Sequence, residues 1–257
     1  LVAVLVGLCT SALVLLFRHA IEWFHYFFNE ILGNEGILGG FLEGLGMNPA
    51  WALVLTLSLA GFIVGSIMHY FVGHEKYHGV ANIMESVALS GGRLRYRLMP
   101  FKVIASAISL GAGASVGPED PSVQIGSNIG SLFGAKLHFS EDNRRLLVSA
   151  GAASAIAAAF NAPIAGVFFA LEVILGEFST TSFGAVVLAA VVSSAFTQSI
   201  EGANPVFGQL EYVLGSYSAR KLGLTTTANA GGMQNILISH SNNELTDLLK
   251  KMDKGLL

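Results

Sequence analysis

The sequence predicts an all-α integral membrane protein that contains broken helices, and three observations support this. First, 53% of its 257 residues are hydrophobic and only 12% are charged, whereas soluble domains carry about 25% charged residues. Second, the chain contains apolar runs of about 20 residues, the length at which a helix crosses a bilayer. Third, shorter apolar segments are interrupted by Gly, Pro or Asn, as is typical of transporters with discontinuous helices.

Two apolar runs are long enough to span a membrane. The first covers residues 1–17 and continues into IEWFHYFF, whose Trp23 and Tyr26 suit a membrane interface. The second covers residues 51–72. Five shorter apolar segments follow at 101–116, 123–133, 146–160, 164–175 and 183–196. Because the sequence begins with Leu1 inside an apolar run, we expect its true start to be missing and assign no signal peptide.

Charge and cysteine content exclude some classes of protein. The net charge of −3 and the lack of a basic block give no reason to expect a nucleic-acid partner. The single cysteine, Cys9, excludes an intramolecular disulfide. Basic residues gather in GGRLRYRLMPFK (91–102) and DNRR (142–145), and the positive-inside rule would place such loops in the cytoplasm. Snorkelling of these side chains at an interface is an equal alternative, so the orientation stays open.

The stretch GAGASVGPEDPSVQIGSNIG, residues 111–130, places two acids between two prolines in an apolar region. Asp120 suits an N-cap and Pro121 a first helical residue, which predicts a helix to about Phe133. The free N–H groups and positive dipole end of that helix form an anion site. Glu119, just outside the cap, would compete with a free anion and so gate the site. The alternative is that both acids merely cap a helix at the membrane surface.

A second proline-marked helix start lies in AAAFNAPIAGVFFALEV. Asn161 is the predicted N-cap and Pro163 follows it, while the small residues before Asn161 would let helices approach closely. Two such starts in one apolar region suggest two helix dipoles that converge inside the membrane. Two ordinary proline-containing helix ends are the alternative.

Two further ionisable residues are candidates for function. Glu172 lies on an apolar segment, and an acid at membrane depth is a functional candidate by default; an interfacial position near Glu177 is the alternative. His78 precedes Gly79 and Val80 in a glycine-containing stretch before another predicted helix. It would donate a hydrogen bond to an anion and titrate near neutrality, unless its role is structural.

Metal and nucleotide sites are not expected. The histidine spacings match no metal site, and there is no HExxH motif. The loop GAGASVG has the spacing GxGxxxG, and no acid follows about 20 residues later as a dinucleotide site requires. We therefore expect no cofactor and no enzymatic activity, with a nucleotide-dependent membrane enzyme as a remote alternative.

With these motifs the chain resembles the CLC chloride channels and chloride/proton antiporters. GPEDP followed by SVQIGSNIG resembles the family's GREGP motif and the helix behind it. RLMPFK resembles the preceding family segment with its lysine, here Lys102, and FNAPIAG resembles FNAPLAG. The resemblance covers about residues 1–215. It implies an α-helical, broken-helix fold of two inverted repeats, a homodimer with one pore per subunit, and a multi-pass location, which we expect to be the plasma membrane.

The resemblance also implies site residues. The gating glutamate falls on Glu119, and the chloride-binding GSGIP segment falls near His78, Gly79 and Val80. Backbone N–H groups of helix starts would line the anion path. The anion-binding residues implied in this way are His78, Gly79, Val80, Gly117 and Asp120.

Departures from the family pattern lie at this site. Pro118 replaces the basic residue of GREGP and Asp120 replaces its second glycine, so one positive charge is lost and one negative charge is gained. The inner proton-relay glutamate of the antiporters falls on Val173, with Glu172 before it. Strict proton coupling is therefore not expected, and Glu172 is the proton-relay candidate.

The predicted function is transport of chloride or a similar small anion in a channel-like manner. A proton-coupled antiporter and a non-conducting or regulatory subunit are the alternatives. The family's second repeat, with its GxFxP motif and anion-binding tyrosine, is absent. We therefore expect a fragment, a disrupted gene product or half of a split protein, whose partners are the bilayer, a second copy and the missing half.

Residues 216–257 form a polar tail. NILIS predicts a short strand and ELTDLLKKM predicts a helix. We interpret the tail as the start of a soluble α/β module or as a non-native junction, because it is too short to form a core alone.

Overall fold

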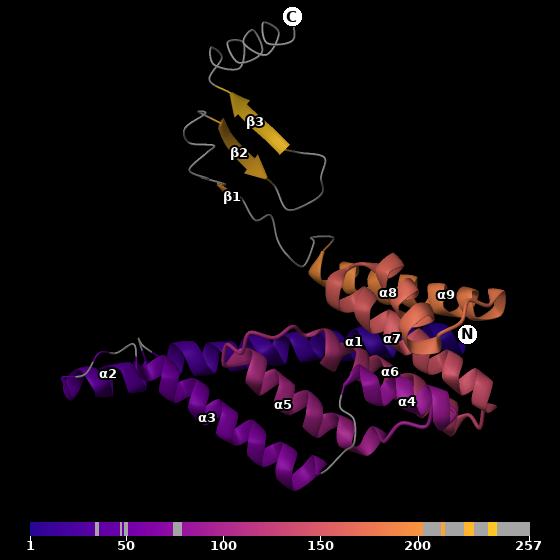
Figure 1. Cartoon of the computed structure of the whole chain (residues 1–257), viewed down its shortest axis with the longest axis horizontal. Coiled ribbons are helices and arrows are strands. Elements are labelled where there is room, and N and C mark those ends of the chain that lie inside the picture. Colours follow the sequence, from indigo (N-terminus) through magenta and orange to yellow (C-terminus); the bar gives the residue numbers. More distant parts are fainter. Residues whose placement is uncertain are drawn as a thin grey trace, which may run out of the picture. The chain divides into compact units, whose positions relative to one another are not determined.

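The computed structural model describes residues 1–33, 36–46, 48, 51–73, 79–202, 212–213, 224–228 and 236–240. The chain divides into two compact units, Leu1–Ala203 and Asn204–Leu257 (Figure 1). Throughout its described residues the first unit contains helices and turns, and the strands lie in the second. The boundary expected at residue 215 falls outside the described residues and stays a prediction.

The first unit is built from nine α-helices and four short π- or 3₁₀-helical segments in its described residues. The first half consists of α1 (Val2–His25), η1 (Tyr26–Ile31), α2 (Ile37–Gly44), α3 (Trp51–Ile67), η2 (Met68–Val72) and α4 (Val80–Leu89). The second half consists of η3 (Tyr96–Leu98), α5 (Met99–Gly111), α6 (Glu119–Lys136), α7 (Glu141–Phe160), α8 (Pro163–Phe169), η4 (Ala170–Leu175) and α9 (Thr180–Glu201).

Among the residues that the structure describes, three helices are long and apolar enough to cross a membrane. They are Val2–Ile31, Trp51–Val72 and Ser182–Glu201. The predicted span at 51–72 is confirmed at both ends, and the apolar run at 1–17 is the start of a longer helix. Pro163–Leu175 and Val80–Leu89 are apolar but shorter, which confirms the broken-helix, all-α membrane architecture.

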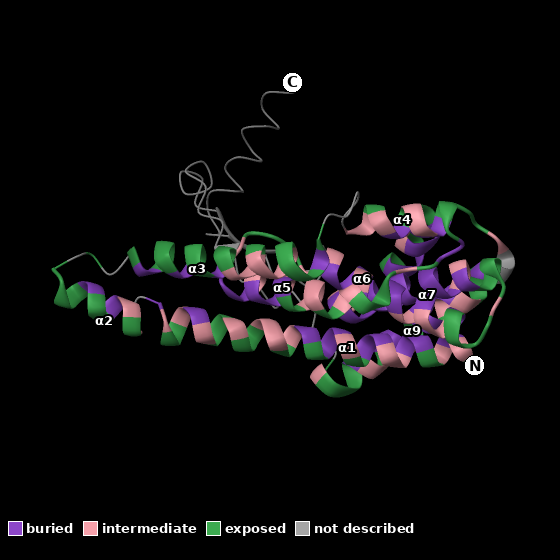
Figure 2. Cartoon of the chain, turned by 90° about the horizontal axis from the view of Figure 1, so that it is seen from below, coloured by how far each residue is buried: buried purple, intermediate pink, exposed green. Residues whose placement is uncertain are grey.

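The α3 helix shows how the bilayer replaces a protein core. Only 17% of the residues in its most apolar window are buried within the chain, and Figure 2 shows much of it as exposed. The exposed apolar side chains of this helix include Leu53, Val54, Leu55, Leu57, Leu59 and Phe62. Water would oppose such a surface, whereas lipid tails cover it without cost.

Close backbone contact between α6 and α7 forms the centre of the unit. Gly126, Gly130 and Gly134 recur every fourth residue and so lie on one face of α6. A Cβ on Gly126 would collide with the carbonyl of Gly151, and one on Gly130 would collide with that of Leu147. Only glycine permits this approach, as in other membrane helix pairs with small residues four apart.

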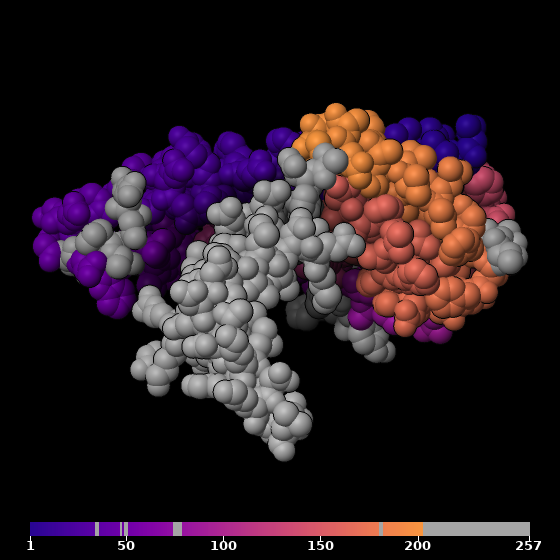
Figure 3. Space-filling model, turned by 90° about the horizontal axis from the view of Figure 1, so that it is seen from above, coloured from indigo at the N-terminus to yellow at the C-terminus, as the bar shows by residue number. Residues whose placement is uncertain are grey.

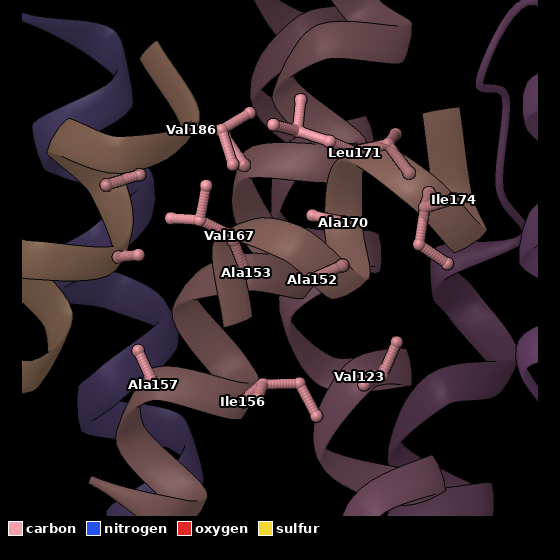
Figure 4. Packing of buried hydrophobic residues seen from close by; sticks show 14 of the residues in the cluster. Val123, Ala152, Ala153, Ile156, Ala157, Val167, Ala170, Leu171, Ile174 and Val186 are labelled. Carbon is pink, nitrogen blue, oxygen red and sulfur yellow. The ribbon is translucent and has the colours of Figure 1, made fainter. Parts of the chain in front are cut away.

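An alanine-rich core surrounds this helix pair. Figure 4 shows α6, α7, α8, η4 and α9 contributing buried side chains to one cluster, the main core. Its labelled members are Val123, Ala152, Ala153, Ile156, Ala157, Val167, Ala170, Leu171, Ile174 and Val186. In Figure 3, α9 lies beside the N-terminal part of α1, and both α8 and α9 pack against α7. The Arg18 and Glu201 side chains form an ion pair between α1 and α9.

Asn161 has a different role from the one predicted. It ends α7 in the left-handed conformation, with φ 53°, and Ala162 is the N-cap of α8. The Asn161 Oδ1 accepts hydrogen bonds from Ser194 Oγ (3.1 Å) and Gln198 Nε2 (2.6 Å) of α9. The predicted N-cap is therefore wrong, because asparagine tolerates the left-handed turn while its side chain joins α7 to α9.

The second unit contains a three-stranded antiparallel sheet in the order β1-β2-β3. Its strands are Tyr212–Val213, Leu224–Ala228 and Ile236–His240. Thr226 of β2 pairs with Ile238 of β3. The strand predicted in NILIS is confirmed, one residue later than expected, and the helix predicted in ELTDLLKKM lies outside the described residues.

Candidate anion site

The helix after the GPEDP motif begins earlier than predicted. Its first residue is Glu119 and its N-cap is Pro118, so Asp120 and Pro121 lie inside the first turn. The backbone N–H and the Oγ of Ser122 both donate to the Pro118 carbonyl, at 3.1 and 2.7 Å. Proline is tolerated there because the first four N–H groups of a helix have no partner within it. The prediction of Asp120 as N-cap is therefore wrong.

Instead, the Asp120 side chain contacts a second helix start. Its Oδ1 accepts the backbone N–H of Val80, the first residue of α4, at 2.7 Å. Its Oδ2 accepts from Gln124 Nε2, one turn further along α6, also at 2.7 Å. Bonds of this kind to an ionised carboxylate are roughly twice as strong as neutral ones. The half-buried carboxylate thus lies where two helices begin, and the dipole of each helix favours a negative charge there.

Gly79 makes room for this carboxylate. It is the N-cap of α4 and has φ 68° and ψ −146°, a conformation that residues with a Cβ rarely adopt. A Cβ added to Gly79 would overlap the Asp120 carboxylate and lie 2.9 Å from its Cγ. The predicted anion contact of His78 lies outside the described residues.

Glu119 has different surroundings. Its side chain is exposed, and its carboxylate occupies the position that a Cβ on Gly117, in the exposed loop before α6, would take. Glu119 is therefore at the N-terminal end of α6, as a gating group requires, while Asp120 makes the contact with α4. The gating role of Glu119 and the anion contacts of Gly117 stay predictions.

A small polar cavity lies beside Gly79 and Gln124, two neighbours of the Asp120 carboxylate. It has a volume of about 20 Å³, enough for about one water-sized species. Its lining consists of Gly79, Asn82, Ile83, Leu94, Arg95, Met99, Lys102, Gln124 and Asn128. Arg95 and Lys102 bring positive charge to this lining, so the surroundings suit an anion better than a cation.

The second predicted helix start and Glu172 lie elsewhere. Helix α8 has seven residues and packs against α7, α9 and η4. The helix starts that the described structure brings together are those of α4 and α6, rather than those of α6 and α8. Glu172 is exposed on η4, whereas its neighbour Val173 is half-buried against the main core. The proton-relay role of Glu172 stays a prediction.

The side-chain contacts of Asp120 were not predicted from the sequence. Asp120 was expected to contribute its backbone N–H, and its side-chain contact with Val80 was missed. The sequence feature that could have indicated this contact is Asp120 itself, an acid at the position of the second glycine of GREGP.

The fold and the site define a multi-pass membrane protein whose broken helices begin around an acidic motif. Residues 60–252 match the family model of the voltage gated chloride channel, so the chain belongs to this family. It is 32% identical over 190 residues to a ClcB-like chloride channel protein of Ralstonia nicotianae, covering 72% of this chain and 44% of that protein. It is 30% identical over 230 residues to chloride channel protein CLC-f of Arabidopsis thaliana, covering 84% and 28%.

Solved structures agree with this assignment. A slow cyanobacterial Cl⁻/H⁺ antiporter superposes with a TM-score of 0.63 at 25% identity, over 86% of this chain and 52% of that one. A CLC-type fluoride/proton antiporter superposes with a TM-score of 0.61 at 25% identity, over 77% and 45%. The predicted family and CLC-type fold are confirmed, and the chain spans about half the length of these relatives or less.

Proposed function

We propose that this chain takes part in moving chloride or a similar small anion across a membrane, in a channel-like manner, with Glu119 as the gate. The observation that carries the proposal is the meeting of the α4 and α6 starts at a bound negative charge. Family membership supports the same function, since the relatives in Ralstonia nicotianae and Arabidopsis thaliana are chloride channel proteins.

The proposed mechanism uses backbone donors and one mobile acid. N–H groups at helix starts replace part of the hydration shell of the anion, and the helix dipoles stabilise its charge. The ionised Glu119, at the first residue of α6, competes with the anion for these groups. Rotation or protonation of Glu119 then opens the path.

Reconstitution in liposomes tests the proposal. The chain is reconstituted alone and together with the part of the Ralstonia relative that it does not match, and chloride efflux is recorded with a chloride electrode. We expect efflux from the paired preparation and little from the chain alone, because the chain spans only about half the length of its relatives or less. If the two polypeptides copurify and no efflux occurs, the chain is a non-conducting or regulatory subunit.

A proton-coupled antiporter is the second candidate, because both solved structures compared above are proton-coupled antiporters. Here Glu172 would relay protons beside Val173. Proton movement at a fixed ratio to chloride, abolished by Glu172→Gln, would favour it over a channel.

The proposal also covers the location of the protein and the molecules with which it assembles. We place the protein in the plasma membrane as a homodimer, without a cofactor, a nucleic-acid partner or enzymatic activity. Cell-surface labelling tests the location and cross-linking in lipid tests the dimer. A nucleotide-induced rise in melting temperature would instead favour a nucleotide-dependent membrane enzyme.

A further inference from the structure

The Asp120 carboxylate lies in a place built for a negative group. One oxygen takes the N–H at the start of α4, and the other takes the amide of Gln124. Gly79 leaves the space that the carboxylate fills. Arg95 and Lys102 line the cavity beside Gly79 and Gln124. These features come from α4, α5, α6 and the loop before η3, so distant parts of the sequence cooperate to hold one charge.

We propose that Asp120 is a second tethered anion, distinct from the gate, that keeps free anions away from the start of α4. The inference rests on the proposed function and names a regulatory residue of the same site. Because the Asp120 Oδ1 lies 2.7 Å from the Val80 nitrogen, a free anion reaches that N–H only by displacing the side chain. A tethered group competes at a high effective concentration, so Asp120 lowers the anion affinity of the site.

A purely structural role for Asp120 makes a different prediction. In that case the carboxylate would only fasten α4 to α6, and its charge would be irrelevant to anion binding. Asparagine separates the two roles. Its Oδ1 still accepts from Val80, and the Gln124 amide can turn to present its oxygen to the new amide group, so the fastening is kept while the charge is removed.

The test measures chloride binding by thermal stabilisation of the full chain. Purified chain is melted in detergent across a series of sodium chloride concentrations, with sodium gluconate holding the ionic strength constant. A ligand that binds the folded state raises the melting temperature with its concentration, so the half-saturating chloride concentration reports affinity even if the chain conducts nothing. The variants are Asp120→Asn, Asp120→Gly, Glu119→Gln and a control, Asp142→Asn. Asp142 is an exposed acid in the first turn of α7.

We expect Asp120→Asn to lower the half-saturating chloride concentration about tenfold, while Asp142→Asn leaves it unchanged. Asp120→Gly should show the same rise in affinity together with a lower melting temperature without chloride. If wild type or Glu119→Gln responds to chloride and Asp120→Asn binds no more tightly than wild type, Asp120 is structural and the inference is wrong. If no variant responds to chloride, the proposed function fails and the inference with it.

Discussion

Two consecutive acids at the start of α6 are held in different ways. Asp120 is half-buried and bonded to α4 and α6, whereas Glu119 is exposed beside Gly117. Moving a carboxylate that is held by two charge-assisted hydrogen bonds costs more free energy than moving one that packs against a glycine. Of the two, Glu119 is therefore the one suited to frequent movement, and Asp120 the one suited to a fixed charge.

Neutralising Glu119 tests its role as gate. In the paired liposome preparation, Glu119→Gln should raise chloride efflux severalfold and flatten its dependence on pH, because the competing charge is gone at every pH. The matched control is Glu43→Gln, at an exposed acid of α2, which should leave both properties unchanged. Efflux from Glu119→Gln that keeps the pH dependence of wild type would count against Glu119 as gate.

For individual residues, the sequence predicted a helix start at the acidic motif but not the partner of the Asp120 side chain. The positions of two prolines and two acids were enough to predict a helix start with anion-binding character. The contact between Asp120 and Val80 joins residues 40 positions apart, and helix capping rules describe only neighbours within a few residues. These rules therefore predicted that Asp120 caps its own helix, α6, rather than α4.

The packing of α6 on α7 depends on glycines whose missing side chains allow backbone contact. A Cβ on Gly130 would lie 2.8 Å from the backbone nitrogen of Val148 and would overlap the carbonyl of Leu147. Both obstacles are backbone atoms in the buried centre of α7, so no flexible side chain can move aside.

Gly130→Ala is therefore expected to push α6 away from α7 and to cost about 1–3 kcal/mol of stability, the usual range for overpacking. The melting temperature in detergent measures this change. Gly61→Ala is the matched control, since Gly61 is helical and exposed on α3 with no atom within 4 Å of an added Cβ. Equal melting temperatures for the two variants would show that this backbone contact does not stabilise the unit.

Helices that face lipid were easier to predict than helix ends inside the protein. Trp51–Val72 matched its apolar run at both ends because hydropathy alone decides where such a helix can lie. Asparagine is a favoured residue at N-caps, but Asn161 instead ends α7, where its side chain accepts hydrogen bonds from α9. Helix α2 was not predicted, since it has only eight residues and no span-length apolar run marks it.

On the scale of the whole molecule, exposed aromatic residues mark one depth in the bilayer. The chain has two tryptophans. Trp23, near the end of α1, is 60% exposed, and Trp51, at the start of α3, is 56% exposed. Figure 1 shows these ends of the two helices at the same end of the unit. Since tryptophan favours the headgroup level, both residues should lie at one membrane interface.

Quenching by brominated lipids tests this placement. Single-tryptophan variants, Trp23→Phe and Trp51→Phe, are reconstituted with lipids brominated either near the headgroup or near the end of the acyl chains. Each remaining tryptophan should be quenched more strongly by the shallow bromines, because its ring nitrogen favours the wet side of the interface while its apolar body contacts lipid. Two equal quenching profiles would place both helix ends at one depth. Strong quenching of one tryptophan by the deep bromines, or by aqueous acrylamide alone, while the other is quenched by the shallow bromines, would show that these ends do not share an interface and that the α1–α3 arrangement in the bilayer differs from the one described.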